Sequence, residues 1–171
     1  CAEMYFPAGA NVAEIGSGAG FPSLPLKIVR DDLSFALVES VEKKCVFLRE
    51  AVKELGLKNI QVIHMRAEDG GKNRAYREKF DVCCARAVAR LNTLSEYCVP
   101  FVKIGGRFIA YKGSAEEELR EAENAFRVLG VKTVACERYD LPEEMGKRTL
   151  IVAEKIFSTP AAYPRGNGKE R

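Results

Sequence analysis

Short apolar runs alternate with amphipathic segments along the chain, and this spacing predicts strands and helices in turn. Residues 34–39 (SFALVE) are almost continuously apolar, which is typical of a strand covered on both faces of a parallel sheet. Residues 41–55 place Val41, Cys45 and Leu48 at helical spacing, with charged side chains between them. By the same patterns, strands are expected at residues 11–16, 34–39, 60–65, 80–85, 107–112, 131–141 and 147–156.

Helical patterns fill most of the segments between these strands. The first three helices are expected at residues 22–30, 41–55 and 91–101. The third should bend or end near Pro100. Ser114 and Glu117 have the spacing of a capping box that begins a fourth helix, and Gly130 should end it. The polar residues 70–78 are predicted to form a loop or a short helix.

Composition indicates one globular domain with a full apolar core. The 171 residues are 47% hydrophobic and 30% charged, and we expect a domain at residues 1–157 followed by a tail at 158–171. No apolar run reaches the roughly 18 residues that cross a bilayer, and no signal peptide is recognisable. Because the chain begins at Cys1 rather than Met, we expect a fragment whose N-terminus is missing.

The cysteines and the single histidine suggest a cytoplasmic protein without a metal. None of the six cysteines has CxxC spacing, and Cys83 and Cys84 lie next to each other in an apolar strand pattern. Reduced, mostly buried thiols are the simplest interpretation. His64 is the only histidine, so no metal site is expected.

The net charge of +3 is concentrated at the C-terminal end. From Lys155 to Arg171 there are four basic residues and one acidic residue, which equals the excess of the whole chain. A basic tail that contains proline and glycine is typical of a phosphate-rich partner. The alternative is a solvated end without a partner.

A glycine-rich turn (EIGSGAGFP) between the first strand and the first helix is the most informative motif. Such a turn is where a nucleotide-like cofactor binds. The spacing of Gly16, Gly18 and Gly20 departs from the dinucleotide fingerprint G-x-G-x-x-G, whose third glycine would fall at Phe21. Glu14 adds a carboxylate beside the turn, which suits a cofactor with a cationic amino-acid end, such as S-adenosylmethionine (SAM). An ordinary glycine-rich turn is the alternative.

The order of the elements predicts how the sheet is built. Five alternating strand and helix units precede two β runs separated only by a short polar turn, which cannot hold a crossover helix. The fold is therefore expected to be α/β and doubly wound, a mostly parallel seven-stranded sheet with a C-terminal antiparallel β-hairpin. This is the class I SAM-methyltransferase version of the Rossmann-like fold, whereas a dinucleotide-binding sheet would stay parallel at that end. An NAD dehydrogenase is accordingly a distant alternative.

Ligands of open α/β sheets bind at the carboxyl ends of the strands, which singles out further positions. Glu39 ends the second strand and can accept hydrogen bonds from both ribose hydroxyls. Residues 65–69 follow the third strand and can offer backbone groups and an acid to the adenine amino group. Arg86 ends the fourth strand opposite the glycine turn. As alternatives, Glu68 is an acid favoured at a helix N-terminus and Arg86 belongs to a surface ion pair.

The chain resembles the RsmG/GidB family, the bacterial 16S ribosomal RNA guanine-N7 methyltransferases. The stretches that carry the resemblance run in order along the chain, at residues 14–26, 38–48, 66–68, 80–81, 85–91, 112–113 and 159–165. The tail motif TP…YPR is rare among methyltransferases and makes the match sharper than the glycine turn alone. The resemblance implies 16S rRNA or the small ribosomal subunit as partner, and SAM contacts at Gly16, Phe21, Ala67, Glu68 and Arg86.

Three features depart from the family's pattern. The family usually has Asp where Glu14 and Glu39 stand, so the charge is kept but moved outward. Its helical segment before the first strand is absent from this chain, and any contacts from that segment would be lost. After Arg165 the family's proline- and lysine-bearing stretch does not continue, so the end is expected to be truncated, divergent or artefactual.

The implied reaction needs no general base. Guanine N7 has a free lone pair at neutral pH, so its alignment with the methyl carbon and the sulfur is the main task left to the protein. No catalytic residue is therefore predicted, and His64 is most simply a residue of the third strand. Cys84 is the only nearby candidate for the nucleophile of a cytosine-C5 enzyme, and a buried strand thiol is the simpler interpretation.

RNA would be held mainly through its phosphates. The candidates are Arg90, Lys112, Arg148 and Arg165, with Tyr163 available to stack on a base. Lys112 ends the fifth strand on the cofactor side and is the preferred substrate contact. Arg148 is equally a surface charge of the hairpin, and Tyr163 can instead pack the tail back on the body.

Two other functions stay open at this stage. One is a SAM-dependent methyltransferase of a small molecule or protein, against which the basic tail argues. The other is a ribosome-associated RNA-binding protein that holds SAM without turnover. A monomer is the default expectation.

Overall fold

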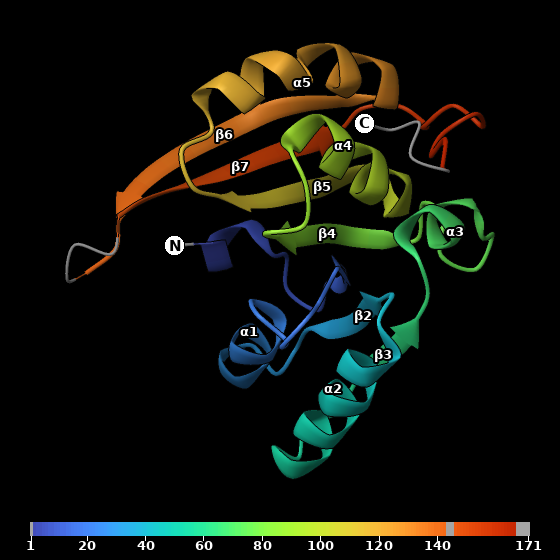
Figure 1. Ribbon diagram of the computed structural model, residues 1–171, viewed down its shortest axis with the longest axis vertical. Helices are drawn as coiled ribbons and strands as arrows, with labels where there is room; N and C mark the ends of the chain where they lie inside the picture. Colours follow the sequence, from blue (N-terminus) through green and yellow to red (C-terminus); the bar gives the residue numbers. More distant parts are fainter. Residues whose placement is uncertain (1, 143–145, 167–171) are drawn as a thin grey trace.

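The computed structural model describes residues 2–142 and 146–166, which form one seven-stranded sheet with helices on both faces (Figure 1). The strands are β1 (Asn11–Ile15), β2 (Ser34–Glu39), β3 (Ile60–His64), β4 (Phe80–Arg86), β5 (Val102–Lys112), β6 (Val131–Asp140) and β7 (Lys147–Lys155). Their order across the sheet is β3-β2-β1-β4-β5-β7-β6. Strands β1 to β5 are parallel, and β7 pairs antiparallel with both β5 and β6. The predicted fold class is confirmed, including its C-terminal hairpin.

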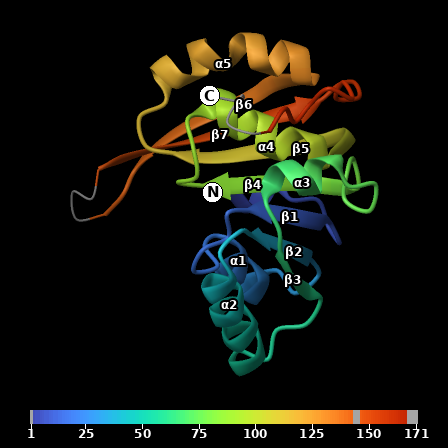
Figure 2. The ribbon, with the colours of Figure 1, turned by 45° about the vertical axis from the view of Figure 1, so that its right-hand side comes forward.

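The helices divide between the two faces of the sheet. They are α1 (Ser23–Val29), α2 (Glu42–Glu54), α3 (Ala67–Lys72), α4 (Leu91–Cys98) and α5 (Glu116–Leu129), with 3-10 turns η1 (Ala2–Tyr5) and η2 (Val99–Phe101). Leu24 of α1 and Leu48 of α2 belong to one core layer, whereas Leu94 of α4 and Phe126 of α5 belong to the other. Figure 2 shows α3, α4 and α5 following one another along the half of the sheet from β4 to β7, and α1 and α2 beside β1 to β3. None of these helices is long and apolar enough to cross a membrane.

Alternating side chains of the central strands fill the two core layers. In β4, Cys83 faces the layer of α4 and α5 and Cys84 faces the layer of α1 and α2, and both are fully buried. Burial raises the pKa of both thiols well above the ordinary value, so neither is a ready nucleophile. The buried-thiol interpretation of Cys84 is thereby confirmed.

The register of the parallel strands brings their carboxyl ends together at one edge of the sheet. Ile15 at the end of β1 pairs with Val38 of β2 on one side and with Ala85 of β4 on the other. Glu39 at the end of β2 pairs with His64 at the end of β3. The glycine turn and the segments after β2, β3 and β4 therefore meet along this edge, where the sequence predicted a cofactor.

The predicted capping box at the start of α5 was wrong. No capping box begins α5, because Ala115 is its N-cap and no side chain of that cap hydrogen-bonds the first turn. Instead, three consecutive acids (Glu116, Glu117 and Glu118) lie in the first turn, where the helix dipole favours them. Most of residues 70–78, predicted as a loop or a short helix, form a loop, and the first three end the short helix at Ala67–Lys72. Its buried positions are glycines, so hydrophobic periodicity could not reveal it.

Strand β5 begins five residues earlier than predicted. Its first residue, Val102, pairs with Phe80, and after a register shift Arg107 pairs with Val82. The extra residues include Gly105, whose φ of +78° is a conformation that favours glycine. Because glycines and a charged residue interrupt the apolar pattern here, sequence periodicity places the strand's start too late.

Candidate cofactor and substrate site

The glycine turn between β1 and α1 is fixed against the end of β2. The amides of Gly16 and Ser17 donate to the Val38 carbonyl at 2.8 and 3.3 Å. Gly16 has a φ of +66°, and a Cβ built on it would lie 2.7 Å from Val88 Cγ2. Both the backbone conformation and the close approach of Val88 therefore require glycine at this position.

Glu39 supports the same turn from the end of β2. Its carboxylate is buried, with Oε2 accepting from the Gly18 amide at 3.0 Å and Oε1 accepting from the Val41 amide at 2.9 Å. Each oxygen keeps a second lone pair, so the carboxylate can still accept from ribose hydroxyls. The ribose contact remains a prediction, and the structure adds a role in shaping the turn.

Gly20 has a different use within the turn. A Cβ built on it would lie 2.4 Å from Leu24 Cδ1, so this glycine allows α1 to pack closely against the turn. Its predicted contact with a cofactor remains untested.

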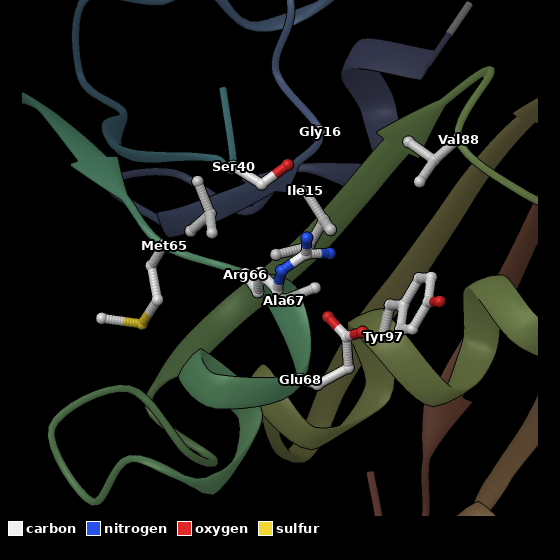
Figure 3. A pocket seen from close by; sticks show the side chains of 10 residues that line it. Ile15, Gly16, Ser40, Met65, Arg66, Ala67, Glu68, Val88 and Tyr97 are labelled. Carbon is white, nitrogen blue, oxygen red and sulfur yellow. The ribbon is translucent and has the colours of Figure 1, made fainter. Parts of the chain in front are cut away.

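A pocket of about 140 Å³ opens beside the turn at the carboxyl ends of β1, β2 and β3 (Figure 3). Its lining residues are Ile15, Gly16, Val38, Ser40, Met65, Arg66, Ala67, Glu68, Val88 and Tyr97. Three predicted cofactor residues, Gly16, Ala67 and Glu68, are thus brought together. In Figure 3, Ser40 lies on one side of the pocket and Glu68 and Tyr97 lie on the other. We call this space the turn pocket.

Glu14 is a buried carboxylate without a full set of partners. Its side chain is 1% exposed, and neither its Oε2 nor the neighbouring Ser23 Oγ has a hydrogen-bond partner of good geometry. Burial raises the pKa of Glu14 to about 7, although Ser23 and the charge of Arg86 oppose the rise. A buried acid with an unsatisfied oxygen is suited to receive a cation, but Glu14 lines neither pocket described here, so its contact with the ammonium group of SAM stays a prediction.

A second, larger pocket of about 690 Å³ lies between the glycine turn and the β6–β7 hairpin. Its lining residues are Phe21, Pro22, Pro25, Arg86, Ala87, Tyr111, Lys112, Gly113, Glu118, Tyr139, Leu141 and Arg148. Figure 1 shows this end of the hairpin extending past the other strands. We call this space the hairpin pocket. It brings together two predicted cofactor residues, Phe21 and Arg86, and two predicted RNA contacts, Lys112 and Arg148.

Arg86 and Phe21 form one wall of the hairpin pocket. The Arg86 guanidinium carbon lies 5.5 Å from the centre of the Phe21 ring, which is a cation–π geometry. The Phe21 side chain is 50% exposed. An exposed aromatic ring beside a pocket is available to a planar ligand, so this wall fits a nucleobase as well as part of a cofactor.

The predicted RNA contacts differ in how available they are. Lys112 donates to the Ala89 carbonyl at 2.8 Å, pairs with Glu118 at 2.7 Å and is only 10% exposed. A phosphate would have to displace Glu118, so Lys112 is a less accessible contact than the sequence suggested. Arg90 makes a bidentate pair with Glu121 on the surface, with Nε donating to Oε2 and Nη2 to Oε1. Arg148 lines the hairpin pocket and donates to the Lys147 carbonyl at 2.8 Å, which leaves more of its guanidinium for a ligand.

The two tail candidates line neither pocket and pack on the body. Tyr163 is half-buried against the core layer of α4 and α5, as the alternative interpretation proposed. Arg165 pairs with the buried Glu96 of α4 at 2.7 Å and lies 5.5 Å over the Tyr163 ring. The predicted basic residues Lys169 and Arg171 lie outside the described residues.

His64 is a surface residue at the end of β3. Its Nδ1 lies 2.7 Å from a carboxylate oxygen of Glu42, and its Nε2 lies 3.0 Å from the Ser40 carbonyl. It lines neither pocket, so a role as general base has no geometric support. Among residues 2–142 and 146–166, no three His, Cys, Asp or Glu side chains gather in a way that could hold a metal ion.

Several lining residues were not singled out by the sequence. Ser40 directly follows the end of β2 and could have been found from that position alone, as Met65 was within the predicted residues 65–69. Tyr97 lies inside α4, whereas Tyr111 and Tyr139 lie inside strands, and nothing in their local pattern distinguishes them from core residues. Only the pairing of β5, β7 and β6 reveals that the last two share a pocket.

Comparison with known proteins identifies a matching family. The family model described as rRNA small subunit methyltransferase G (GidB) matches residues 2–145. Ribosomal RNA small subunit methyltransferase G from Brevibacillus brevis is 50% identical over 168 residues, covering 96% of this chain and 71% of the relative. The protein of the same name from Lactobacillus acidophilus is 50% identical over 167 residues, covering 97% of this chain and 70% of the relative.

Solved structures share the fold at low sequence identity. TYW2 from M. jannaschii in complex with AdoMet has a TM-score of 0.69 at 15% identity, covering 90% of this chain and 73% of that protein. A SAM-dependent O-methyltransferase from Thermotoga maritima has a TM-score of 0.67 at 16% identity, covering 93% of this chain and 64% of that protein. These similarities support a common methyltransferase architecture.

Proposed function

The chain belongs to the GidB family of rRNA small subunit methyltransferases, and on this premise we propose that it transfers a methyl group from SAM to N7 of a guanine in 16S rRNA. The observation that carries the site assignment is that the glycine turn lines both pockets. Gly16 borders the turn pocket and Phe21 borders the hairpin pocket. A single turn thus joins a small recess beside the strand ends to a larger recess on the substrate side.

The residues present fit SAM. We assign the unsatisfied, buried Glu14 to the ammonium group and Glu39 to the ribose hydroxyls. Ala67 and Glu68 line the turn pocket, and we assign the Ala67 backbone and the Glu68 carboxylate to adenine. When bound, SAM supplies a methyl group on a positively charged sulfur.

The reaction requires the protein to align guanine N7 with the methyl carbon and sulfur, more than to transfer a proton. Guanine N7 attacks through its own lone pair, the bond between the methyl carbon and sulfur breaks, and the purine gains the positive charge. The protein's task is to hold the base by its plane and exclude other orientations, for which the exposed Phe21 ring is suited. Arg86 lies over that ring, and Glu118 also lines the pocket and can offset the product's charge.

RNA around the target base is assigned to the hairpin. Arg148 borders both the hairpin pocket and an adjoining recess of about 210 Å³ that Arg138 and Lys147 also line. Arg138 is paired with Glu116 at 2.9 Å, so Arg148 and Lys147 are the preferred phosphate contacts there. A ribosomal RNA substrate implies action in the cytoplasm, and a monomer remains the expectation.

The test is transfer of labelled methyl from SAM to small ribosomal subunits that lack the modification, run beside protein-free rRNA. We expect label in the RNA with the parent chain and much less with Glu14→Gln. If SAM binds but no small-subunit RNA is labelled, a binding protein without turnover replaces the proposal. If label appears instead on a small molecule or protein, the substrate assignment is wrong.

A further inference from the structure

The segment after β7 is fastened to the body by an unusually dense set of polar contacts. Arg77, in the loop between α3 and β4, donates to four backbone carbonyls. One belongs to Gly71 in α3 at 2.7 Å, and the others belong to Thr159, Pro160 and Tyr163 at 2.7, 3.2 and 2.8 Å. One guanidinium therefore ties α3 to the C-terminal segment.

A buried ion pair anchors the beginning of the segment. Lys155 is fully buried and donates to Glu78 Oε1 at 2.8 Å and to the Val99 carbonyl at 3.1 Å. The same Glu78 oxygen accepts from the Thr159 amide at 2.9 Å. The segment thus leaves β7 in a fixed direction, towards α3 and α4.

Arg165 fastens the far end of the segment to α4. Its Nη2 donates to Glu96 Oε2 at 2.7 Å, and its Nε lies 3.1 Å from each carboxylate oxygen. The Arg165 amide also donates to Glu96 Oε1 at 2.5 Å. The Glu96 side chain is 3% exposed whereas that of Arg165 is 44% exposed, so loss of Arg165 would leave a buried carboxylate without its charged partner.

The same segment reaches the residues that border the turn pocket. Pro164 packs on Gly71 so closely that a Cβ added to Gly71 would lie 3.0 Å from Pro164 Cγ. A Cβ built on Gly166 would lie 4.0 Å from Glu68 Cβ, and Glu68 lines the pocket. On α4, the residue after Glu96 is Tyr97, which lines the pocket from the other helix.

We propose that residues 159–166 form a strap that holds α3 against α4 and so positions Glu68 and Tyr97 at the turn pocket. Arg165 is a positioning residue that acts through Glu96, rather than a phosphate contact. The inference rests on the proposed binding of SAM in this pocket. It also assigns the TP…YPR motif to cofactor binding, whereas its basic character alone suggested RNA.

The test compares two affinities, for SAM and for RNA, in matched variants. Arg165→Ala should weaken SAM binding about tenfold, because coupling between a positioning contact and a site is typically of that order. Its affinity for 16S rRNA, and the dependence of that affinity on salt, should not change. Arg165→Lys should recover only part of the SAM affinity, because lysine cannot make the forked contact with Glu96. Arg127→Ala, on the exposed face of α5, is the matched control and should leave both affinities unchanged.

A second variant, Glu96→Gln, distinguishes a positioning role of Arg165 from a direct RNA contact, even if Arg165→Ala folds poorly. The strap predicts weaker SAM binding in this variant, whereas an RNA-contacting Arg165 released from Glu96 would bind RNA more tightly. Unchanged SAM affinity together with weaker RNA binding in Arg165→Ala would overturn the strap. If the parent chain binds no SAM, the proposed cofactor site fails and the strap fails with it. If the parent binds SAM and both variants bind it equally well, only the strap fails.

Discussion

Glu14 is expected to be only partly ionised at neutral pH in the free protein, which makes both stability and cofactor binding depend on pH. Burial raises its pKa from 4.5 to about 7. The folded protein therefore holds a proton that the unfolded chain has lost between about pH 4.5 and pH 7. Because the raised pKa belongs to the folded state, the contribution of Glu14 to the free energy of unfolding is fully present at low pH. It is lost as the pH rises through this window.

The size of the effect follows from the two pKa values. One pKa unit corresponds to about 1.4 kcal/mol, so the free energy of unfolding should fall by about 3 kcal/mol between pH 4.5 and pH 7 on account of Glu14. Glu14→Gln keeps the shape of the side chain but cannot ionise, and it should lose this dependence. Urea unfolding of parent and variant at several pH values measures the difference directly.

Cofactor binding should show the opposite slope. A bound cation favours the ionised form of Glu14, and the ionised fraction rises about eightfold between roughly pH 6 and pH 7.5. SAM should therefore bind about eightfold more tightly at the higher pH in the parent, as measured by calorimetry. SAM itself also titrates in this range. Dividing the parent's ratio of affinities at the two pH values by the same ratio for Glu14→Gln removes that effect. Equal pH dependence in the two proteins, in unfolding and in binding alike, would refute the assignment of Glu14.

Three further variants test other parts of the account. Gly16→Ala puts a Cβ 2.7 Å from Val88 Cγ2 at a φ of +66°. SAM affinity should therefore fall at least about tenfold, and the free energy of unfolding by about 1–3 kcal/mol. Unaltered SAM affinity would place the cofactor elsewhere. Arg148→Ala should weaken rRNA binding and reduce the slope of log affinity against log salt by about 0.7–0.9 without affecting SAM, and an unchanged slope would exclude a phosphate contact. Lys155→Met leaves the partly exposed Glu78 without its charged partner, so urea unfolding should show a loss of about 1–3 kcal/mol; a loss below about 1 kcal/mol would show that the pair does not stabilise the fold.

The parts of the fold with strong local patterns could be predicted from the sequence. Near-continuous apolar strands such as β2 and amphipathic helices such as α2 carry their period in the chain itself. The glycine turn can be recognised in the sequence because its backbone conformation needs residues without a Cβ. The C-terminal hairpin could be predicted because the turn between its two strands is too short to hold a crossover helix.

The parts that depend on contacts between distant segments could not be predicted. Helix α3 buries Gly70 and Gly71, so no apolar period marks it. The availability of a basic residue is also invisible in sequence, because Lys112 is paired with Glu118 and Arg165 with Glu96 only after folding. Charge patterns alone therefore could not show how available these residues are to RNA, nor decide between RNA contact and packing for the tail.

The chemical identity of the methylated product tests the central claim most directly. Unmodified small ribosomal subunits would be incubated with the chain and labelled SAM, and the 16S rRNA digested and resolved by mass spectrometry. The account predicts label in N7-methylguanine at one position. Label on a ribose, an exocyclic amine or a pyrimidine carbon, or no label in RNA while SAM is bound, would contradict it.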